Sequence, residues 1–185
     1  MDATPCSVAD EGLYAWMEGS PSAVGVLAFL NDEATTLSIL DYTVGLDIRA
    51  AENLIHHRDG ADQLFGTADD NLFECIAEVD EVWWVGPSTL ETLIAYVDGD
   101  GWIPVGDDLL GVYDNVPFTV NEADDTIAWT NEVSVEFLDD DLDLDRRAVD
   151  SIVEARPLES VLQLSELYYV GESALIKLKT SATKY

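Results

Sequence analysis

Basic residues are scarce in this chain, and their scarcity argues first against one class of function. The 185 residues include 8 Lys and Arg against 38 Asp and Glu, which gives a formal net charge of -30. Because proteins hold duplex DNA largely by neutralising its phosphates with Lys and Arg, direct binding to nucleic acid is disfavoured. The many carboxylates repel one another when the chain is compact. We therefore expect bound cations, a saline medium or a basic partner to offset it.

Long apolar runs and cysteines are also few. The longest apolar run, residues 23–30, is far shorter than the roughly 20 residues that a membrane-spanning helix needs. The opening, residues 1–6, is typical of an initiator methionine placed before a mature sequence whose signal peptide has been removed. Cys6 and Cys75 either form a disulfide in an oxidising compartment or stay unpaired. The 48% of hydrophobic residues still predicts a folded globule.

A repeated unit is the most informative feature of the sequence. Residues 46–58 match residues 144–156, with a shared Leu-Asp-x-Arg-Ala start and a closing Arg. Residues 78–90 match residues 163–175, with a shared aromatic-aromatic-Val-Gly-x-Ser-x-Leu pattern. The first copy is longer by one segment, residues 59–71. The sequence therefore predicts a duplicated structural unit, with an inserted loop in the first copy.

Each copy is expected to form four short helices. Asn31 and Asn131 are predicted to cap the first helix of their copy, and Asp47 and Asp145 the second. Thr119 is predicted to cap a helix before the second copy, with a glutamate at the capping-box position.

The repeated Val-Gly step precedes the last helix of each copy. Gly86 and Gly171 are expected to turn the chain there, because glycine tolerates positive φ. The last helix is then expected to begin at Ser88 or Ser173. Neither serine lies in a nucleophile elbow, and the sequence has only two histidines to act as bases, so we expect no enzyme activity.

These patterns together resemble the helix-hairpin-helix family, specifically the paired-hairpin units of competence-type DNA receptors and the tandem hairpin proteins of deltaproteobacteria. Residues 29–97 and 127–179 carry the resemblance. It implies a mainly α fold of two helix-hairpin-helix repeats packed together, with a short extended or turn-rich linker. The expected divisions are an N-terminal segment with a short helix at 1–28, repeat 1 at 29–97 with an acidic insertion at 59–71, a linker at 98–118 and repeat 2 at 119–185.

Hairpins of this family bind DNA through backbone N-H groups of a Gly-hydrophobic-Gly turn. Here Trp84 and Tyr169 replace the first glycine of the second hairpins, and residues 141–143 have lost both glycines of a first hairpin. The phosphate contact is therefore expected to be disabled. The arginines that remain are expected to pair with neighbouring carboxylates; they are Arg49, Arg58, Arg147 and Arg156.

Two aromatic pairs, Trp83 with Trp84 and Tyr168 with Tyr169, admit two interpretations. Packing in the core, or between hairpins or repeats, is the favoured one. The alternative is an exposed protein-binding face, where Trp and Tyr are preferred anchors.

The insertion at residues 59–71 is a candidate calcium loop. Hard cations take six to eight oxygen ligands, and alternating Asp and Gly supply them from side chains and carbonyls. The spacing departs from an EF-hand, so an acidic loop of Asx turns is the alternative. Zinc is not expected, because His56 and His57 point in different directions on a helix. The candidate calcium ligands are Asp59, Asp62, Asp69, Asp70 and Asn71.

The sequence thus predicts a non-catalytic acidic binding or scaffold protein that recognises a protein partner and is stabilised by calcium. We expect it in the periplasm, associated with the outer membrane as lipoproteins are, or secreted. The alternative is a nucleic-acid-related helix-hairpin-helix protein, either a weak DNA binder or an acidic mimic of DNA. No membrane span is expected.

Overall fold

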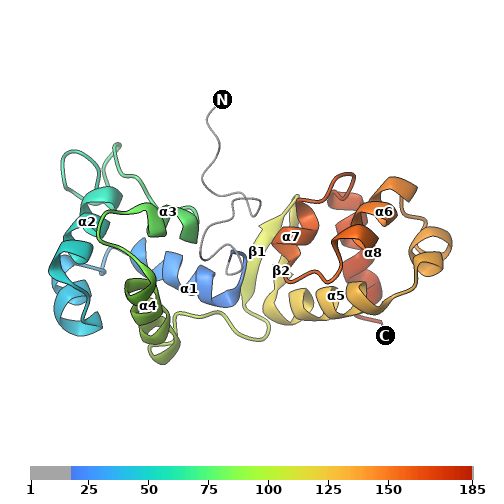
Figure 1. The fold of residues 1–185 in the computed structure, drawn as a ribbon, viewed down its shortest axis with the longest axis horizontal. Helices are drawn as coiled ribbons and strands as arrows, with labels where there is room; N and C mark the ends of the chain where they lie inside the picture. The colour runs from blue at the N-terminus through green and yellow to red at the C-terminus, as the bar shows by residue number, and fades with distance from the viewer. Residues whose placement is uncertain (1–17, 185) are drawn as a thin grey trace. The chain divides into compact units, whose positions relative to one another are not determined.

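The computed structural model describes residues 18–184, which are mainly helical and divide into two compact units (Figure 1). Of the described residues, unit 1 contains residues 18 and 22–103, and unit 2 contains residues 19–21 and 104–184. The predicted mainly α class is confirmed. Most of the short helix expected within residues 1–28 lies outside the described residues.

Unit 1 is built from helices around one apolar core. Its buried residues include Leu40, Leu54, Ile76, Leu90 and Leu93, which are 0 to 1% exposed. Within one helix the buried residues recur at helical spacing, as Leu90, Leu93 and Val97 do in α4, so that the helix presents an apolar stripe to the core. The elements are α1 (Pro21–Leu30), the π-helical turn η2 (Ile39–Val44), α2 (Ile48–Arg58), α3 (Ile76–Glu81) and α4 (Pro87–Gly99).

Unit 2 begins with an antiparallel hairpin that contacts α5 (Figure 1). Residues 98–118, expected as a linker, thus supply the end of α4, all of β1 and part of β2. Asp114 and Asn115 connect the strands with φ of 44° and 65°, which suits the twist of a tight hairpin. The elements are β1 (Leu109–Tyr113), β2 (Val116–Thr119), α5 (Val120–Glu132), the π-helical turn η3 (Phe137–Asp141), α6 (Arg146–Ala155), α7 (Val161–Ser165) and α8 (Glu172–Ala182).

Three of the predicted helix caps are confirmed. Asp47 and Asp145 each accept a hydrogen bond from the backbone N-H two residues later, at the starts of α2 and α6. Thr119 and Glu122 form the predicted capping box at the start of α5. These bonds satisfy N-H groups that a helix start leaves without partners.

The caps predicted at Asn31 and Asn131 are wrong. A helix ends just before Asn31 instead of beginning there, and Asn131 lies inside α5. The Asn31 side chain accepts from the backbone N-H of Phe73 and donates to its carbonyl, at 2.9 Å each. Asn131 makes the same pair of bonds to Leu158, at 2.8 and 2.9 Å. Each asparagine therefore ties a helix end to a loop that is far away in sequence.

Cys75 is disulfide-bonded. Its expected partner, Cys6, lies outside the described residues. Among the described residues, no helix is both long enough and apolar enough to cross a membrane.

Candidate functional site

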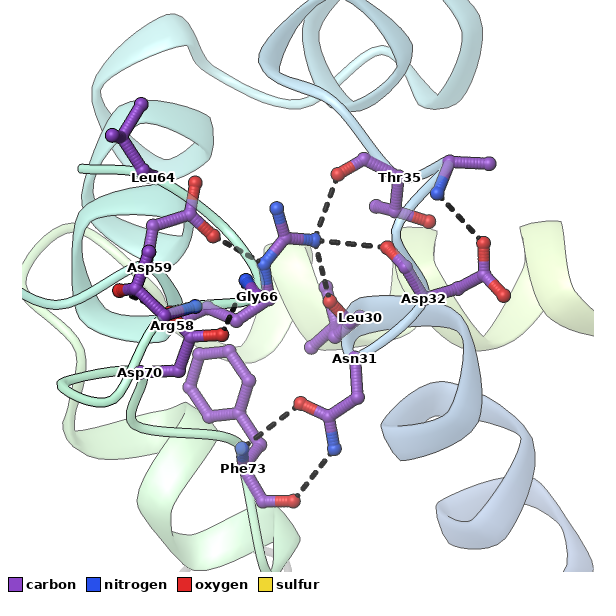
Figure 2. A network of polar contacts seen from close by, with 12 residues as sticks. Leu30, Asn31, Asp32, Thr35, Arg58, Asp59, Leu64, Gly66, Asp70 and Phe73 are labelled. Atoms are coloured by element: carbon purple, nitrogen blue, oxygen red, sulfur yellow. Dashed lines mark hydrogen bonds and ion pairs between the residues drawn. The ribbon is translucent and has the colours of Figure 1, made fainter.

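Asp59, the first candidate calcium ligand, is buried beside Arg58. The Arg58 Nε donates to the Asp59 carboxylate at 2.7 Å, and the two side chains are 4% and 9% exposed. Figure 2 shows the same guanidinium donating to three backbone carbonyls, those of Leu30, Asp32 and Thr35. A buried charge needs such partners to offset its lost hydration. Asp59 therefore neutralises Arg58 beneath the loop.

The next three carboxylates of the loop bind the loop's own backbone. Asp69 accepts from the N-H groups of Ala61 and Asp62 at 2.8 and 3.1 Å. Asp70 accepts from Gly66 at 2.7 Å, and Asp62 accepts from the N-H two residues later. The bond to Asp62 is an Asx turn, as in the alternative interpretation of this loop, whereas Asp69 and Asp70 bind N-H groups four to eight residues earlier.

One hydroxyl group marks where these carboxylates converge. Thr67 Oγ1 lies 2.7 Å from Asp69, 3.3 Å from Asp62 and 3.4 Å from Asp70. The hydrogen bond from Thr67 is the main cause that lowers the pKa of Asp69. Across residues 18–184, no group of three or more His, Cys, Asp or Glu side chains has an arrangement suited to a metal ion. Calcium binding by this loop stays a prediction, and the sequence reasoning had not singled out Thr67.

Asn71 lies at the base of the loop, where it contacts a histidine. Its Nδ2 is 2.6 Å from His57 Nε2, and the same ring nitrogen is 2.9 Å from Glu78 Oε1. The imidazole stacks on Phe73 with ring centroids 4.6 Å apart. The loop base is thus closed by a network that joins α2 to α3, and His57 is a member that the sequence reasoning had considered only as a zinc ligand.

The two aromatic pairs are exposed, so the favoured interpretation as core residues is wrong. Trp83 and Trp84 are 75% and 50% exposed, and Tyr168 and Tyr169 are 84% and 59% exposed. Each pair lies shortly after a short helix, with one residue between the first pair and α3 and two residues between the second pair and α7. In unit 2 the next residue, Val170, is buried at 6% exposure. We call Trp83–Trp84 the first aromatic tip and Tyr168–Tyr169 the second.

The left-handed residue of each tip is the aromatic one, which corrects the role expected for glycine. Trp84 has a φ of 73° and Tyr169 a φ of 68°. Gly86 and Gly171, in contrast, are extended, with φ of -163° and -142°. A bulky side chain with positive φ is strained, whereas glycine adopts this conformation readily. Both units therefore keep an exposed aromatic residue where glycine would fold more easily.

An arginine stacks on the ring of each left-handed aromatic residue. The Arg49 guanidinium carbon is 3.7 Å from the Trp84 ring centroid, and that of Arg147 is 4.2 Å from the Tyr169 ring centroid. Each guanidinium also pairs at 2.8 Å with the aspartate that caps its helix, Asp47 or Asp145. The same three-part arrangement thus occurs in both units.

The capping aspartates are strongly acidic because of these arginines. The hydrogen bonds from the Arg49 side chain, followed by that from its backbone N-H, lower the pKa of Asp47 to about 2. Arg147 lowers the pKa of Asp145 to about 2 in the same way. Since hydrogen bonds to the charged form favour that form, both carboxylates stay ionised under all ordinary conditions.

Arg156 departs from the predicted pairing of arginines with carboxylates. Arg49, Arg58 and Arg147 pair as expected, but the Nε and Nη2 atoms of Arg156 are buried without a hydrogen-bond partner. The residue after Arg58 is an aspartate, whereas Pro157 follows Arg156. Burial lowers the pKa of Arg156. The sequence signal for this difference was the proline in place of the aspartate.

No known protein family matches this chain, and no match was found among the curated proteins or the solved structures.

Proposed function

We propose that this chain is a non-catalytic acidic binding protein that recognises a protein partner through its two aromatic tips. The observation that carries the proposal is the exposure of Trp84 and Tyr169 at left-handed positions. Burial does not account for side chains that are 50% and 59% exposed, and the backbone conformation disfavours them. Exposed Trp and Tyr are the preferred anchors of protein interfaces. Backbone strain at an exposed aromatic residue in both units therefore supports a binding role.

The proposed architecture is a tandem pair of helix-hairpin-helix repeats. Its support is the set of contacts that both units share at matching sequence positions: an aspartate cap, an arginine stacked on an aromatic residue, and an asparagine bound to a distant backbone. Shared contacts at matching positions are what a duplicated unit would keep.

A protein partner fits the arginines better than DNA does. Arg49 and Arg147 are held by carboxylates and aromatic rings, and Arg58 is 3% exposed. Phosphate binding needs free cations, and these three are engaged within the chain. An acidic mimic of DNA, which would occupy a basic DNA-binding protein, remains the second candidate because the net charge of -30 favours a basic partner.

We place the protein in an oxidising compartment, as a periplasmic, outer-membrane-associated or secreted protein. The support is the disulfide at Cys75, because reducing compartments keep thiols free.

The experiment compares three versions of the full chain as baits in a lysate of source cells. The tip variant carries Trp83→Ala, Trp84→Gly, Tyr168→Ala and Tyr169→Gly, with glycine at the two left-handed positions to preserve the fold. The control variant carries Tyr42→Ala and Leu64→Ala, which remove other large exposed side chains that are 84% and 61% exposed.

We expect one protein to be retained by the wild type and the control but lost from the tip variant. Binding of that purified protein is then measured directly, and we expect the tip variant to bind at least about tenfold more weakly, as removal of interface anchors does. Equal binding to all three versions would exclude the tips as the contact. Displacement of DNA from the purified partner by this chain would identify the acidic-mimic alternative.

A further inference from the structure

The first unit has no free arginine or lysine on its described surface. Arg49 and Arg58 are its only Arg or Lys residues. Arg58 is buried against Asp59 and three carbonyls. Arg49 pairs with Asp47 through two hydrogen bonds of 2.8 and 2.9 Å. The remaining carboxylates of this unit therefore have no Arg or Lys partner within its described residues, and their negative charge favours a positively charged partner.

Arg49 shows how this surface holds a cation. Its N-H groups donate to the Asp47 carboxylate while its guanidinium carbon lies 3.7 Å from the centroid of the Trp84 ring. Trp is the best aromatic partner for a cation, and a carboxylate beside the ring adds a charge-assisted hydrogen bond. The second unit repeats this chemistry with Arg147, and so the arrangement is a property of the repeated unit.

Trp83 is the ring of this tip that carries no cation from the described chain. Its side chain is 75% exposed and lies edge-to-face on Trp84, with centroids 6.4 Å apart. Its backbone is fixed, because the Asn53 side chain donates to its carbonyl at 2.7 Å. Glu81, two residues earlier, is exposed. The tip thus offers an exposed indole on a backbone that is held in place, with an exposed glutamate two residues earlier in the sequence.

We propose that the first aromatic tip docks a basic segment of the protein partner and that a Lys or Arg side chain of this segment stacks on Trp83. The inference rests on the proposed function and adds the chemistry of the partner. Charge complementarity selects a basic occupant, since the unit has acidic residues in excess and both of its arginines are engaged. The second tip is the weaker site, because it has tyrosines and because all three lysines of the chain belong to its unit.

The test uses a capped tetra-arginine peptide as the probe, titrated into the full chain at physiological ionic strength and followed by calorimetry. Trp83→Leu keeps an apolar side chain and the net charge but removes the π face. Tyr42→Leu is its control, because it removes an exposed aromatic residue of the same unit. Glu81→Gln and Glu33→Gln form a second matched pair, since both glutamates are exposed.

We expect Trp83→Leu to weaken peptide binding by about fivefold, the size of a cation–π contact at an exposed site, while Tyr42→Leu leaves it within about twofold. Glu81→Gln is expected to weaken binding more than Glu33→Gln. Equal affinities for the wild type and Trp83→Leu would overturn the inference, because binding would then be a diffuse effect of net charge. If the tip variant loses its captured protein while Trp83→Leu binds the peptide as the wild type does, the proposed function stands and only this inference fails.

Discussion

The Arg49 guanidinium carbon lies 3.7 Å from the centroid of the Trp84 ring, and Trp84 itself has a φ of 73°. The attraction between ring and cation therefore opposes the backbone strain at the same residue. An exposed cation–π contact contributes roughly 0.5–1 kcal/mol, whereas a left-handed non-glycine residue costs about 1–3 kcal/mol. The strain is the larger of the two.

Replacing the left-handed aromatic residues by glycine should therefore not destabilise the fold. We expect Trp84→Gly and Tyr169→Gly to leave the free energy of unfolding unchanged or to raise it by up to about 1 kcal/mol, measured by urea denaturation. Trp83→Gly is the matched control and should lower stability, because Trp83 has no positive φ to relieve. A loss above about 1 kcal/mol in Trp84→Gly would show that its ring is needed for folding.

The two arginines at the ends of the matching helices α2 and α6 should respond differently to removal of their charge. Arg58→Met is expected to cost about 3–5 kcal/mol, since it leaves the buried Asp59 carboxylate unpaired. Arg156→Met should be neutral or stabilising, because two of its guanidinium nitrogens are buried without partners. Chemical denaturation of both variants checks this. Similar losses at both positions would contradict the lack of partners at these two nitrogens of Arg156.

The asparagines that bind distant backbone groups should be equivalent. Asn31→Ala removes two bonds to Phe73, and Asn131→Ala removes two bonds to Leu158. Each change leaves backbone groups unsatisfied, and we expect each to lower the free energy of unfolding by about 1–3 kcal/mol. Ser134→Ala, which loses only a local contact at 3.1 Å, is the control and should cost less.

Acid should weaken the helix caps over a defined range. The pKa of Asp47 and of Asp145 is lowered from an ordinary value of 3.8 to about 2. Their contribution to stability is therefore fully present above the ordinary value and is lost as the pH falls through about 2. We expect Asp47→Asn to reduce the loss of stability over this interval in an acid titration followed by circular dichroism. Because both pairs are exposed, concentrated salt should diminish the effect.

Calcium binding by residues 59–71 is tested by thermal melts in chelator, in millimolar calcium and in concentrated sodium chloride. We expect calcium to raise the melting temperature more than salt does, and Asp62→Asn with Asp69→Asn to abolish that difference. Asp124→Asn with Asp125→Asn changes the charge equally on the exposed side of α5 and should preserve it. Equal stabilisation by calcium and by salt would leave only charge screening.

Several local features followed from the sequence alone. The caps at Asp47, Asp145 and Thr119 depend on bonds that span two or three residues, so their partners are fixed once the helix forms. The sequence repeat and the excess of acidic residues could also be read from the sequence, because sequence register and composition do not depend on packing. The pairing of Arg49 with Asp47 belongs to this group, since the two residues share one helix start.

Only the tertiary structure decided which side chains are exposed and which long-range partners they have. Asn31 binds Phe73 and not its own helix, because the end of α1 meets a loop distant in sequence. Trp84 takes the left-handed conformation, although the glycine two residues later had been expected to turn the chain. Burial and the choice of partners depend on surfaces that segments remote in sequence bring together. An aromatic residue that looks like a core residue in the sequence, such as Trp83, is therefore exposed when other apolar side chains fill the core.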